Sequence, residues 1–255
     1  MELWVRFEYL GKQGFGTLRN DHVAVYQGDM FKESKATGEF LPVSDINLLI
    51  PTQPSKMIGL WNNFRSRAAK EGWSQPNHPL YFMKANGSFL ATGQTIRQPE
   101  TYDGPVAFEG ELGIVIGERC CNINEDDADK YIFGYTCVND VTARGLMKED
   151  PSFVQWTRAK SFDTFGAVGP VVATGLDVDS LIVKTLVDGV EHQNYPVEDM
   201  FFSPREIVSR LSRDMTLNPG DVIACGTSLG AGPMPQGCTV EIKIDGIGSL
   251  VNLFE

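Results

Sequence analysis

A short segment at 108–117 constrains the fold more than any other part of the chain. Its sequence, Phe-Glu-Gly-Glu-Leu-Gly-Ile-Val-Ile-Gly, is rich in β-branched residues and closes with glycine, which predicts a strand. Because alternate side chains of a strand point to opposite faces, one face carries Phe108, Leu112, Ile114 and Ile116. Glu109 and Glu111 project together from the other face. We therefore expect a largely buried strand that presents two convergent carboxylates.

The composition favours a strand-rich fold around this segment. Of the 255 residues, 42% are hydrophobic and 22% are charged, as in ordinary soluble globular proteins. The 26 glycines indicate many tight turns between short elements. Two prolines within 49–56 disfavour regular structure and mark a boundary near residue 52. We expect a mixed, β-rich α+β protein with a small N-terminal β domain at 1–52 and a larger domain at 53–255.

Local patterns place most of the other elements. The expected strands are 3–7, 22–26, 80–83, 132–138, 222–225, 239–245 and 249–254. Residues 62–72 have helix-forming composition and stop at glycine, and a capping box with proline at the first helical position begins a second helix at 203–214. Asp-Gly at 188–189 predicts a hairpin turn. The segment 156–163 has the composition of a loop.

Charge and cysteine content exclude several classes of partner. With 22 Lys and Arg against 33 Asp and Glu, the net charge of -11 repels nucleic acid and anionic membranes. No apolar run is long enough to span a bilayer, and the first residues carry charges where a signal peptide needs its apolar stretch. The five cysteines are an odd number without C-x-x-C spacing, which favours reduced thiols. We expect a cytoplasmic protein.

The acidic face of the 108–117 strand is a candidate metal site. Two buried carboxylates side by side repel each other unless a cation lies between them, whereas on a solvated edge strand they would need none. Asp140, at the end of the strand expected at 132–138, is a candidate third ligand. Three oxygen ligands favour Mg²⁺, Mn²⁺ or Ca²⁺ over zinc or copper. None of the three histidines has metal-ligand spacing.

A second motif, Gly226-Thr-Ser-Leu-Gly230, formally matches the nucleophile elbow of serine hydrolases. An elbow opens a helix and is followed in the chain by its histidine, but Pro233 and Pro235 block a helix here and no histidine follows residue 192. The segment also lacks the ending of a phosphate-binding P-loop. We interpret it as the turn-rich rim of a pocket.

Taken together, these segments resemble the fumarylacetoacetate hydrolase family over residues 54–255. The matching motifs are Phe108-Glu-Gly-Glu-Leu-Gly113, Asn139-Asp-Val-Thr-Ala-Arg144, Ala159-Lys-Ser-Phe-Asp163, Leu217-Asn-Pro-Gly-Asp-Val-Ile223, Gly226-Thr227 and Asp245-Gly-Ile-Gly-Ser-Leu-Val-Asn252. The resemblance implies a rolled β-sheet core and a homodimer. It further implies Mg²⁺ or Mn²⁺ held by Glu109, Glu111 and Asp140, chemistry on a 2-oxo acid, and substrate contacts from Lys160 and Thr227.

The chain departs from the family pattern in two places. Many members carry a histidine and a glutamate on a lid helix, where this chain has Arg65 and Ala68. The Thr-Ala-Arg motif is usually followed by Asp-x-Gln, whereas residues 145–147 here are Gly-Leu-Met. On closure of the lid, Arg65 is expected to hold the distal carboxylate of a dicarboxylic substrate, and either Glu71 or His78 could take the histidine's place.

Three functions remain open at this stage. The first is hydrolytic cleavage of a carbon–carbon bond in an acylpyruvate-like diketo acid, which passes through an enolate that a divalent cation stabilises. The second is decarboxylation or isomerisation of an unsaturated 2-oxo dicarboxylic acid, which needs no activated water and tolerates arginine at position 65. The third is a ligand-binding protein that has kept the metal site without catalysis. Lys160 and Arg65 are the expected catalytic residues of the first two.

Overall fold

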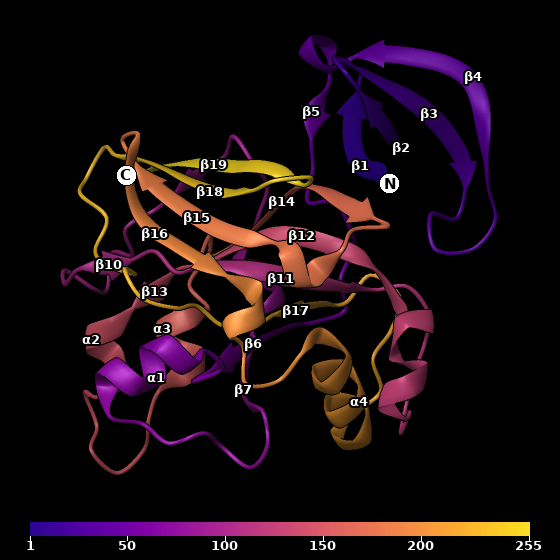
Figure 1. Ribbon diagram of the computed structural model, residues 1–255. Helices are drawn as coiled ribbons and strands as arrows, with labels where there is room; N and C mark the ends of the chain where they lie inside the picture. The colour runs from indigo at the N-terminus through magenta and orange to yellow at the C-terminus, as the bar shows by residue number, and fades with distance from the viewer.

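In the computed structural model, which describes residues 1–255, the chain folds around one large sheet and a smaller sheet that covers part of it (Figure 1). The large sheet follows the order β4-β3-β2-β1-β14-β12-β11-β17-β6-β7, with β5 paired to β1 and β8 to β14. Its strands are β1 Glu2–Tyr9, β2 Lys12–Arg19, β3 His22–Gly28, β4 Ser34–Pro42, β5 Asn47–Leu48, β6 Met57–Trp61, β7 Leu80–Lys84, β8 Phe89–Leu90, β11 Gly110–Ile116, β12 Ile132–Asp140, β14 Gly166–Thr174 and β17 Val222–Ala224.

The smaller sheet has the order β16-β15-β18-β19-β9 and packs against β11, β12 and β14 of the large sheet. Its strands are β9 Thr95–Ile96, β15 Ile182–Val187, β16 Val190–Pro196, β18 Thr239–Ile244 and β19 Gly248–Phe254. A separate pair joins β10 Val106–Ala107 to β13 Thr142–Ala143. This architecture confirms the expected β-rich α+β class.

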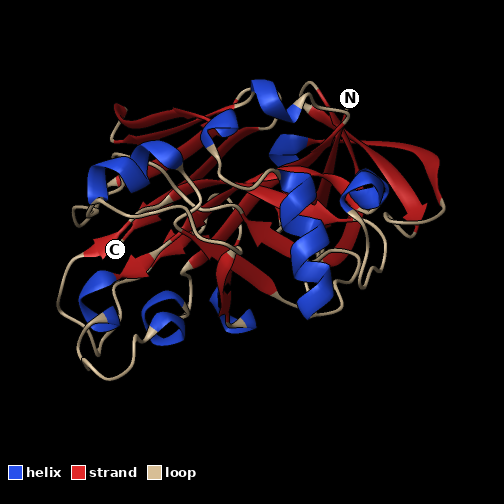
Figure 2. Cartoon of the chain, turned by 60° about the horizontal axis from the view of Figure 1, so that its bottom comes forward, coloured by secondary structure: helices blue, strands red, loops and turns tan.

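The helices are few and lie at the margins of the sheets, as the turned view shows (Figure 2). They are α1 Arg65–Glu71, α2 Arg144–Met147, α3 Trp156–Lys160 and α4 Pro204–Asp214, together with the 3₁₀ helices η1 Val43–Asp45, η2 Asn86–Ser88, η3 Glu125–Lys130, η4 Val178–Ser180 and η5 Val197–Asp199. The first three α-helices gather at one end of the molecule, while α4 packs against η3 (Figure 1). None of the helices has the length and apolar character needed to cross a membrane.

Strand β11 lies in the interior of the large sheet because it has a partner on each side. It pairs antiparallel with β12 and with β17. The alternation expected from the sequence is confirmed: the face that carries Phe108 and Leu112 belongs to the main hydrophobic core, whereas Val115 belongs to a second core cluster on the opposite side. Burial on both faces fixes the register of this strand and thereby the positions of its glutamates.

The N-terminal strands form a meander that projects from the rest of the molecule (Figure 1). Its first strand, β1, also pairs with β14, with Trp4 opposite Val172. The large sheet is therefore continuous across the boundary expected near residue 52, and the division at 1–52 and 53–255 stays a prediction.

Most local expectations are confirmed. Helix α4 has the expected capping box, in which the Ser203 side chain accepts from the Glu206 backbone and Glu206 accepts from Ser203. Asp188 and Gly189 form the hairpin turn with positive φ angles of 49° and 78°. Two expectations need correction. The segment 156–163 is not simply a loop, because it contains α3. The apolar run at 80–83 predicts a buried strand, but it forms β7, which is the edge strand, and Leu80 is exposed.

Candidate metal centre and active site

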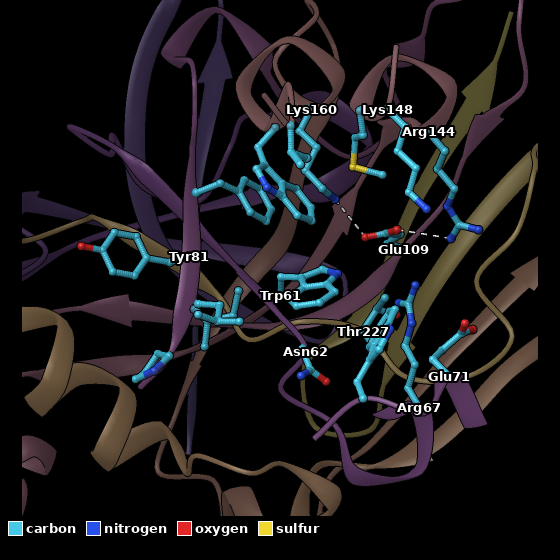
Figure 3. A pocket seen from close by; sticks show the side chains of 18 residues that line it. Trp61, Asn62, Arg67, Glu71, Tyr81, Glu109, Arg144, Lys148, Lys160 and Thr227 are labelled. Atoms are coloured by element: carbon cyan, nitrogen blue, oxygen red, sulfur yellow. Dashed lines mark hydrogen bonds and ion pairs between the residues drawn. The ribbon is translucent and has the colours of Figure 1, made fainter. Parts of the chain in front are cut away.

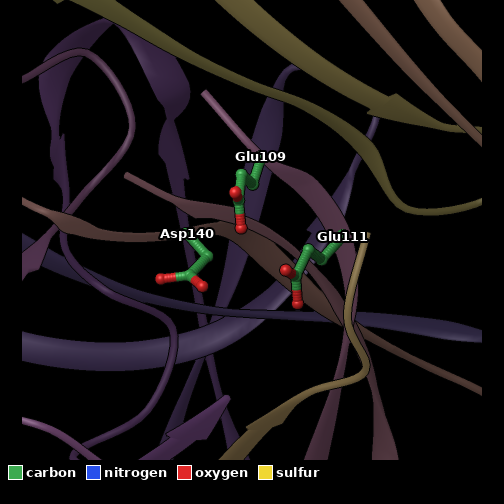
Figure 4. A group of neighbouring side chains, drawn as sticks. All are labelled: Glu109, Glu111 and Asp140. Carbon is green, nitrogen blue, oxygen red and sulfur yellow. The ribbon is translucent and has the colours of Figure 1, made fainter. Parts of the chain in front are cut away.

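Three carboxylates meet at the end of β11. β11 begins at Gly110 and not at the expected 108, so Glu109 immediately precedes the strand, Glu111 is its second residue, and Asp140 is the last residue of the neighbouring β12. The backbone N–H of Asp140 donates to the Glu109 carbonyl oxygen at 2.9 Å, which holds the two strand ends together. One oxygen from each carboxylate lies within 4.8 Å of the others (Figure 4). We call Glu109, Glu111 and Asp140 the acid triad.

The burial of these three carboxylates decides between the two explanations for them, a cation site and a solvated face of an edge strand. Glu109 is 7% exposed, Glu111 1% and Asp140 0%. A solvated face of an edge strand is therefore wrong, because β11 is an interior strand and the three carboxylates are buried. Buried negative charges require positive partners.

Two lysines supply part of that positive charge. The Lys160 Nζ donates to Glu109 Oε2 at 2.9 Å and to Thr142 Oγ1 at 2.8 Å, and it also donates to Asp140. The Nζ of Lys84, which is 2% exposed, donates to the other oxygen of Asp140. Sequence reasoning missed Lys84. The signal was its position two residues after Phe82 on one strand, which places it on the inward face.

The charges of the acid triad are unevenly balanced. Burial would raise the pKa of Glu109, but Lys160, Arg67 and Arg144 outweigh it and lower that pKa to about 2. Burial, together with the carboxylates of Asp140 and Glu109, raises the pKa of Glu111 well above its usual range. The Glu111 Oε2 accepts from the Gly226 N–H at 2.8 Å, but its Oε1 has no hydrogen-bond partner although it is buried.

This arrangement fits a divalent cation. A buried carboxylate oxygen without a partner faces two further carboxylates, and all three donors are oxygens, which are the ligands that Mg²⁺, Mn²⁺ and Ca²⁺ prefer. Glu109, Glu111 and Asp140 would hold the ion. None of the three histidines joins them, since all are exposed.

Opposing effects set the protonation of Lys160. Burial disfavours its charge, but Asp140 and Glu109 raise the pKa of Lys160 above its ordinary value. Lys160 is therefore a cation at neutral pH. It is the last residue of α3, and this short helix carries it over the acid triad.

A buried glutamine, Gln193, fixes the hydroxyl of Thr227. Its hydroxyl donates to the Gly110 carbonyl at 2.9 Å and accepts from Gln193 Nε2 at 2.8 Å. The Oε1 of Gln193 accepts from the Gly110 N–H at 3.0 Å and from the Thr185 hydroxyl at 2.9 Å. Gln193 thus joins the segment at Thr227 to the strand that carries the glutamates, a role that its isolated position in the sequence did not reveal.

A cavity of about 920 Å³ lies above these groups (Figure 3). Glu109, Lys160 and Thr227 line it, as do three further cations that we call the cationic group, namely Arg67, Arg144 and Lys148. Arg144 also donates to Glu109 Oε1 at 3.2 Å. The arrangement can hold a small anion over the acid triad and stabilise negative charge that develops on it.

Arg65 lies outside this cavity, contrary to its expected position. Its guanidinium donates to the backbone carbonyls of Glu198 and Met200 and lies over the Phe201 ring, 5.5 Å from the centroid. The cause is the start of the helix. α1 begins at residue 65 and not at 62, because Phe64 is extended and forms a β-bridge with Met200. Arg67, two positions further on, faces the cavity instead.

The other residues expected near the lid differ in whether they line the cavity. Glu71, at the end of α1, lines the cavity, whereas His78 does not. Met147, which stands where the family usually has a polar residue, lines it too. The Gly226–Gly230 segment opens no helix, in agreement with the rejection of a nucleophile elbow.

Two family models together match almost the whole chain. The family model described as fumarylacetoacetate (FAA) hydrolase C-terminal matches residues 56–255, and a second, described as Rv2993c-like, N-terminal, matches residues 3–51. The oxaloacetate tautomerase YisK of Bacillus subtilis is 35% identical over 236 residues, which cover 87% of this chain and 77% of that protein.

Two solved structures extend this likeness. The 2-hydroxyhepta-2,4-diene-1,7-dioate isomerase of Mycobacterium marinum is 34% identical with a TM-score of 0.91, over 100% of this chain and 98% of that one. The fumarylpyruvate hydrolase of Pseudomonas aeruginosa, in complex with Mn²⁺ and pyruvate, is 27% identical with a TM-score of 0.73, over 82% and 91%. Because the family model matches residues 56–255, the chain belongs to the fumarylacetoacetate hydrolase family.

Proposed function

We propose that the protein is a divalent-metal-dependent enzyme that moves a proton on the carbon next to the 2-oxo group of a small organic acid. The reaction would be a keto–enol or double-bond isomerisation of a 2-oxo acid. One observation carries this proposal: the cavity reaches the acid triad through Glu109 and is lined by Lys160 and the cationic group but by no histidine. Proton transfer at such a carbon needs stabilised negative charge and a base that takes the proton and returns it, for which the Glu71 carboxylate lining the cavity is the candidate, but it needs no activated water.

A bound Mg²⁺ or Mn²⁺ would supply Lewis-acid stabilisation of the negative charge that develops on the 2-oxo oxygen. Lys160, kept cationic by two carboxylates, holds positive charge beside that oxygen and does not act as the base. Thr227, whose hydroxyl is fixed by Gly110 and Gln193, orients the substrate at the opposite side. Named activities among similar proteins, a tautomerase and an isomerase, support this reaction class.

The cationic group is suited to a second carboxylate. Lys148 has no carboxylate bound to it, and Arg67 makes only a 3.5 Å contact with the Thr227 carbonyl. A dicarboxylic substrate would give these side chains a charged partner, and charged hydrogen bonds are worth about 1.5 to 3 kcal/mol. We therefore keep the expected preference for dicarboxylic acids and assign the distal clamp to Arg67 in place of Arg65.

Hydrolysis of a diketo acid is the second candidate, and Glu71 is the observation that favours it. It is the one carboxylate lining the cavity besides Glu109. Since it belongs to no metal-ligand set, it could take a proton from water as a general base. Decarboxylation would need neither water nor this base.

The experiment incubates the purified protein with Mg²⁺ or Mn²⁺ and a panel of oxaloacetate, diketo acids and unsaturated 2-oxo dicarboxylic acids. Ultraviolet absorbance of the enol, released pyruvate and released carbon dioxide are followed in parallel. Changes in enol absorbance without cleavage products support the proposal. Pyruvate release would establish hydrolysis and carbon dioxide release would establish decarboxylation, whereas binding without any turnover would identify a ligand-binding protein.

A matched pair of variants tests the clamp. Arg67→Ala should raise KM for dicarboxylic substrates by roughly tenfold, the scale of a charged hydrogen bond, and leave KM for monocarboxylic ones nearly unchanged. Arg65→Ala is the control, because Arg65 is bonded to backbone carbonyls outside the cavity. Equal effects of the two substitutions would contradict the assignment.

We also propose the twofold-symmetric homodimer that the family resemblance implies. Light scattering at micromolar concentration should give twice the chain mass of 28.2 kDa. A mass of one chain would refute this part of the proposal.

A further inference from the structure

Four aromatic rings line the cavity beside the groups described above. Trp61 ends β6, Trp73 follows α1, Phe82 belongs to β7 and Trp156 begins α3. We call these four residues the aromatic wall. Three of the chain's four tryptophans thus come from separate segments to one cavity.

The four rings form one continuous surface. The centroids of Trp61 and Trp73 are 4.6 Å apart, and those of Trp61 and Trp156 are 5.9 Å apart. Trp156 is stacked on Phe82 at 5.5 Å with an angle of 7° between the planes. The wall is therefore a continuous but folded surface, because the Trp61 ring is inclined by 45° to Trp73 and by 59° to Trp156.

This surface is open to the cavity. Trp61, Trp73 and Trp156 are only partly buried, whereas Trp4, the remaining tryptophan, is 7% exposed and packed in a core cluster. Tryptophan left partly in water forgoes hydrophobic stabilisation that a ligand could supply. Several such side chains lining one concave site indicate binding of an apolar or conjugated group.

The wall adjoins Arg67 of the cationic group and also Lys160. The Arg67 guanidinium lies over the Trp73 ring at 5.9 Å from its centroid, and the Lys160 ammonium lies over the Phe82 ring at 4.8 Å. One molecule could then place a 2-oxo acid head over the acid triad and a flat substituent against the wall. The cavity volume of about 920 Å³ is near the upper end of the range for drug-sized ligands, well beyond the needs of a four-carbon acid.

We propose that the substrate is a 2-oxo acid that carries an aryl group, and that the aromatic wall selects this ring. The inference rests on the proposed function, since it takes the acid triad end as the place of the 2-oxo acid. It goes beyond that function because it separates acids that carry an aromatic ring from small dicarboxylic acids such as oxaloacetate.

The test compares two diketo acids that differ in one group. Binding of 2,4-dioxopentanoate, which carries a methyl group, and of 2,4-dioxo-4-phenylbutanoate, which carries a phenyl ring, is measured by calorimetry on the Mg²⁺-loaded protein. The phenyl compound should bind roughly tenfold or more tightly, since it buries a ring against aromatic surface. Turnover of both compounds is recorded separately through the enol absorbance.

Variants assign the preference to the wall. Trp73→Leu, in a segment outside the sheets, should reduce the phenyl-to-methyl affinity ratio by about threefold or more, and Trp61→Leu should reduce it further because Trp61 touches two other rings. Phe40→Leu is the control, because Phe40 is 61% exposed on β4 of the N-terminal meander. The melting temperature of each variant reports whether it has folded.

The outcomes separate the inference from the proposed function. Equal affinities of the wild-type protein for the two acids, or a phenyl preference that both tryptophan variants retain, would overturn the inference. A phenyl preference that the variants lose would support it even if no enol chemistry occurred, and the absence of that chemistry would overturn the proposed function alone.

Discussion

Two buried carboxylate sites in this protein differ in how fully their oxygens are bonded. Asp221, which is 0% exposed, receives five hydrogen bonds: from the backbone and hydroxyl of Ser55, from the backbone and ammonium of Lys56, and from the backbone of Asn218. In the acid triad, Glu111 is just as buried, but one of its oxygens has no partner and two other carboxylates lie beside it.

The difference distinguishes a structural carboxylate from a functional one. Asp221 joins the turn before β17 to the segment before β6, two neighbouring strands of the large sheet, and its oxygens have no capacity left for a ligand. The acid triad, when all three of its carboxylates are ionised, carries more negative charge than Lys84 and Lys160 balance. Burying such a site costs folding free energy, which is consistent with selection for binding a cation and not for stability alone.

The largest effect is expected at the fully bonded site. Asp221→Asn removes the charge that pairs with Lys56 and places amide hydrogens against donors, so the free energy of unfolding should fall by about 3 kcal/mol. Urea denaturation in the presence of a chelator measures this loss. Asp127→Asn is the control, because Asp127 is paired with Lys130 on the surface and its loss should leave the free energy of unfolding nearly unchanged.

The acid triad should respond in the opposite way. Glu111→Gln replaces a carboxyl group whose ionisation is disfavoured by burial, Asp140 and Glu109, so the metal-free protein should be at least as stable as the wild type, in contrast to Asp221→Asn. Metal affinity should nevertheless fall tenfold or more in Glu109→Gln, Glu111→Gln and Asp140→Asn, because each loses an anionic ligand. Calorimetric titration with Mg²⁺ and Mn²⁺ checks this. Unchanged affinity in all three variants, or destabilisation of Glu111→Gln as large as that of Asp221→Asn, would show that the triad is structural.

A smaller effect concerns pH. Burial, Asp140 and Glu109 raise the pKa of Glu111, so the folded metal-free protein keeps a proton that the unfolded chain releases at lower pH. The stability linked to this proton is present at low pH and is lost as pH rises through the raised pKa. A cation must displace the proton, so metal affinity should increase with pH over the same interval.

Calorimetry in two buffers of different ionisation enthalpy counts the protons that Mg²⁺ releases. The wild type should release more protons at mildly acidic pH than Glu111→Gln does. If the two released equal numbers, the proton would not reside on Glu111.

The contrast between the two carboxylate sites was only partly visible in the sequence. The acid triad could be predicted because side-chain alternation along one strand and the end of the next are local features, and strand pairing brings them together. Lys84 and Gln193 could not be placed, because their partners lie far away in the sequence. Lys84 is 56 residues from Asp140, and Gln193 is 34 residues from Thr227. Their roles depend on tertiary contacts.

The lid shows how a small local error changes a site assignment. The sequence predicted a helix at 62–72, but Asn62 has a positive φ of 55° and the α-helix begins only at Arg65. Because successive helical residues are rotated by about 100° around the axis, a prediction of which arginine faces the cavity needs the orientation of the helix as well as its existence. The aromatic wall could likewise not be predicted from the sequence, because its rings come from four separate segments.

The smallest effect is expected at Ser228, which tests whether an unpaired buried atom alone marks a functional site. Its hydroxyl is buried and has no hydrogen-bond partner, as one oxygen of Glu111 has none, yet Ser228 does not belong to the cluster of acidic side chains and does not line the cavity. Ser228→Ala should therefore change the free energy of unfolding by less than about 1 kcal/mol, and leave metal affinity and turnover within about twofold of the wild type. Turnover matters here because Ser228 is the serine of the formal nucleophile motif. A loss of a hundredfold or more would reinstate a nucleophilic role for it, whereas unchanged turnover together with the sensitivity of Glu111→Gln would show that convergent charge, and not an unpaired polar atom, identifies the site.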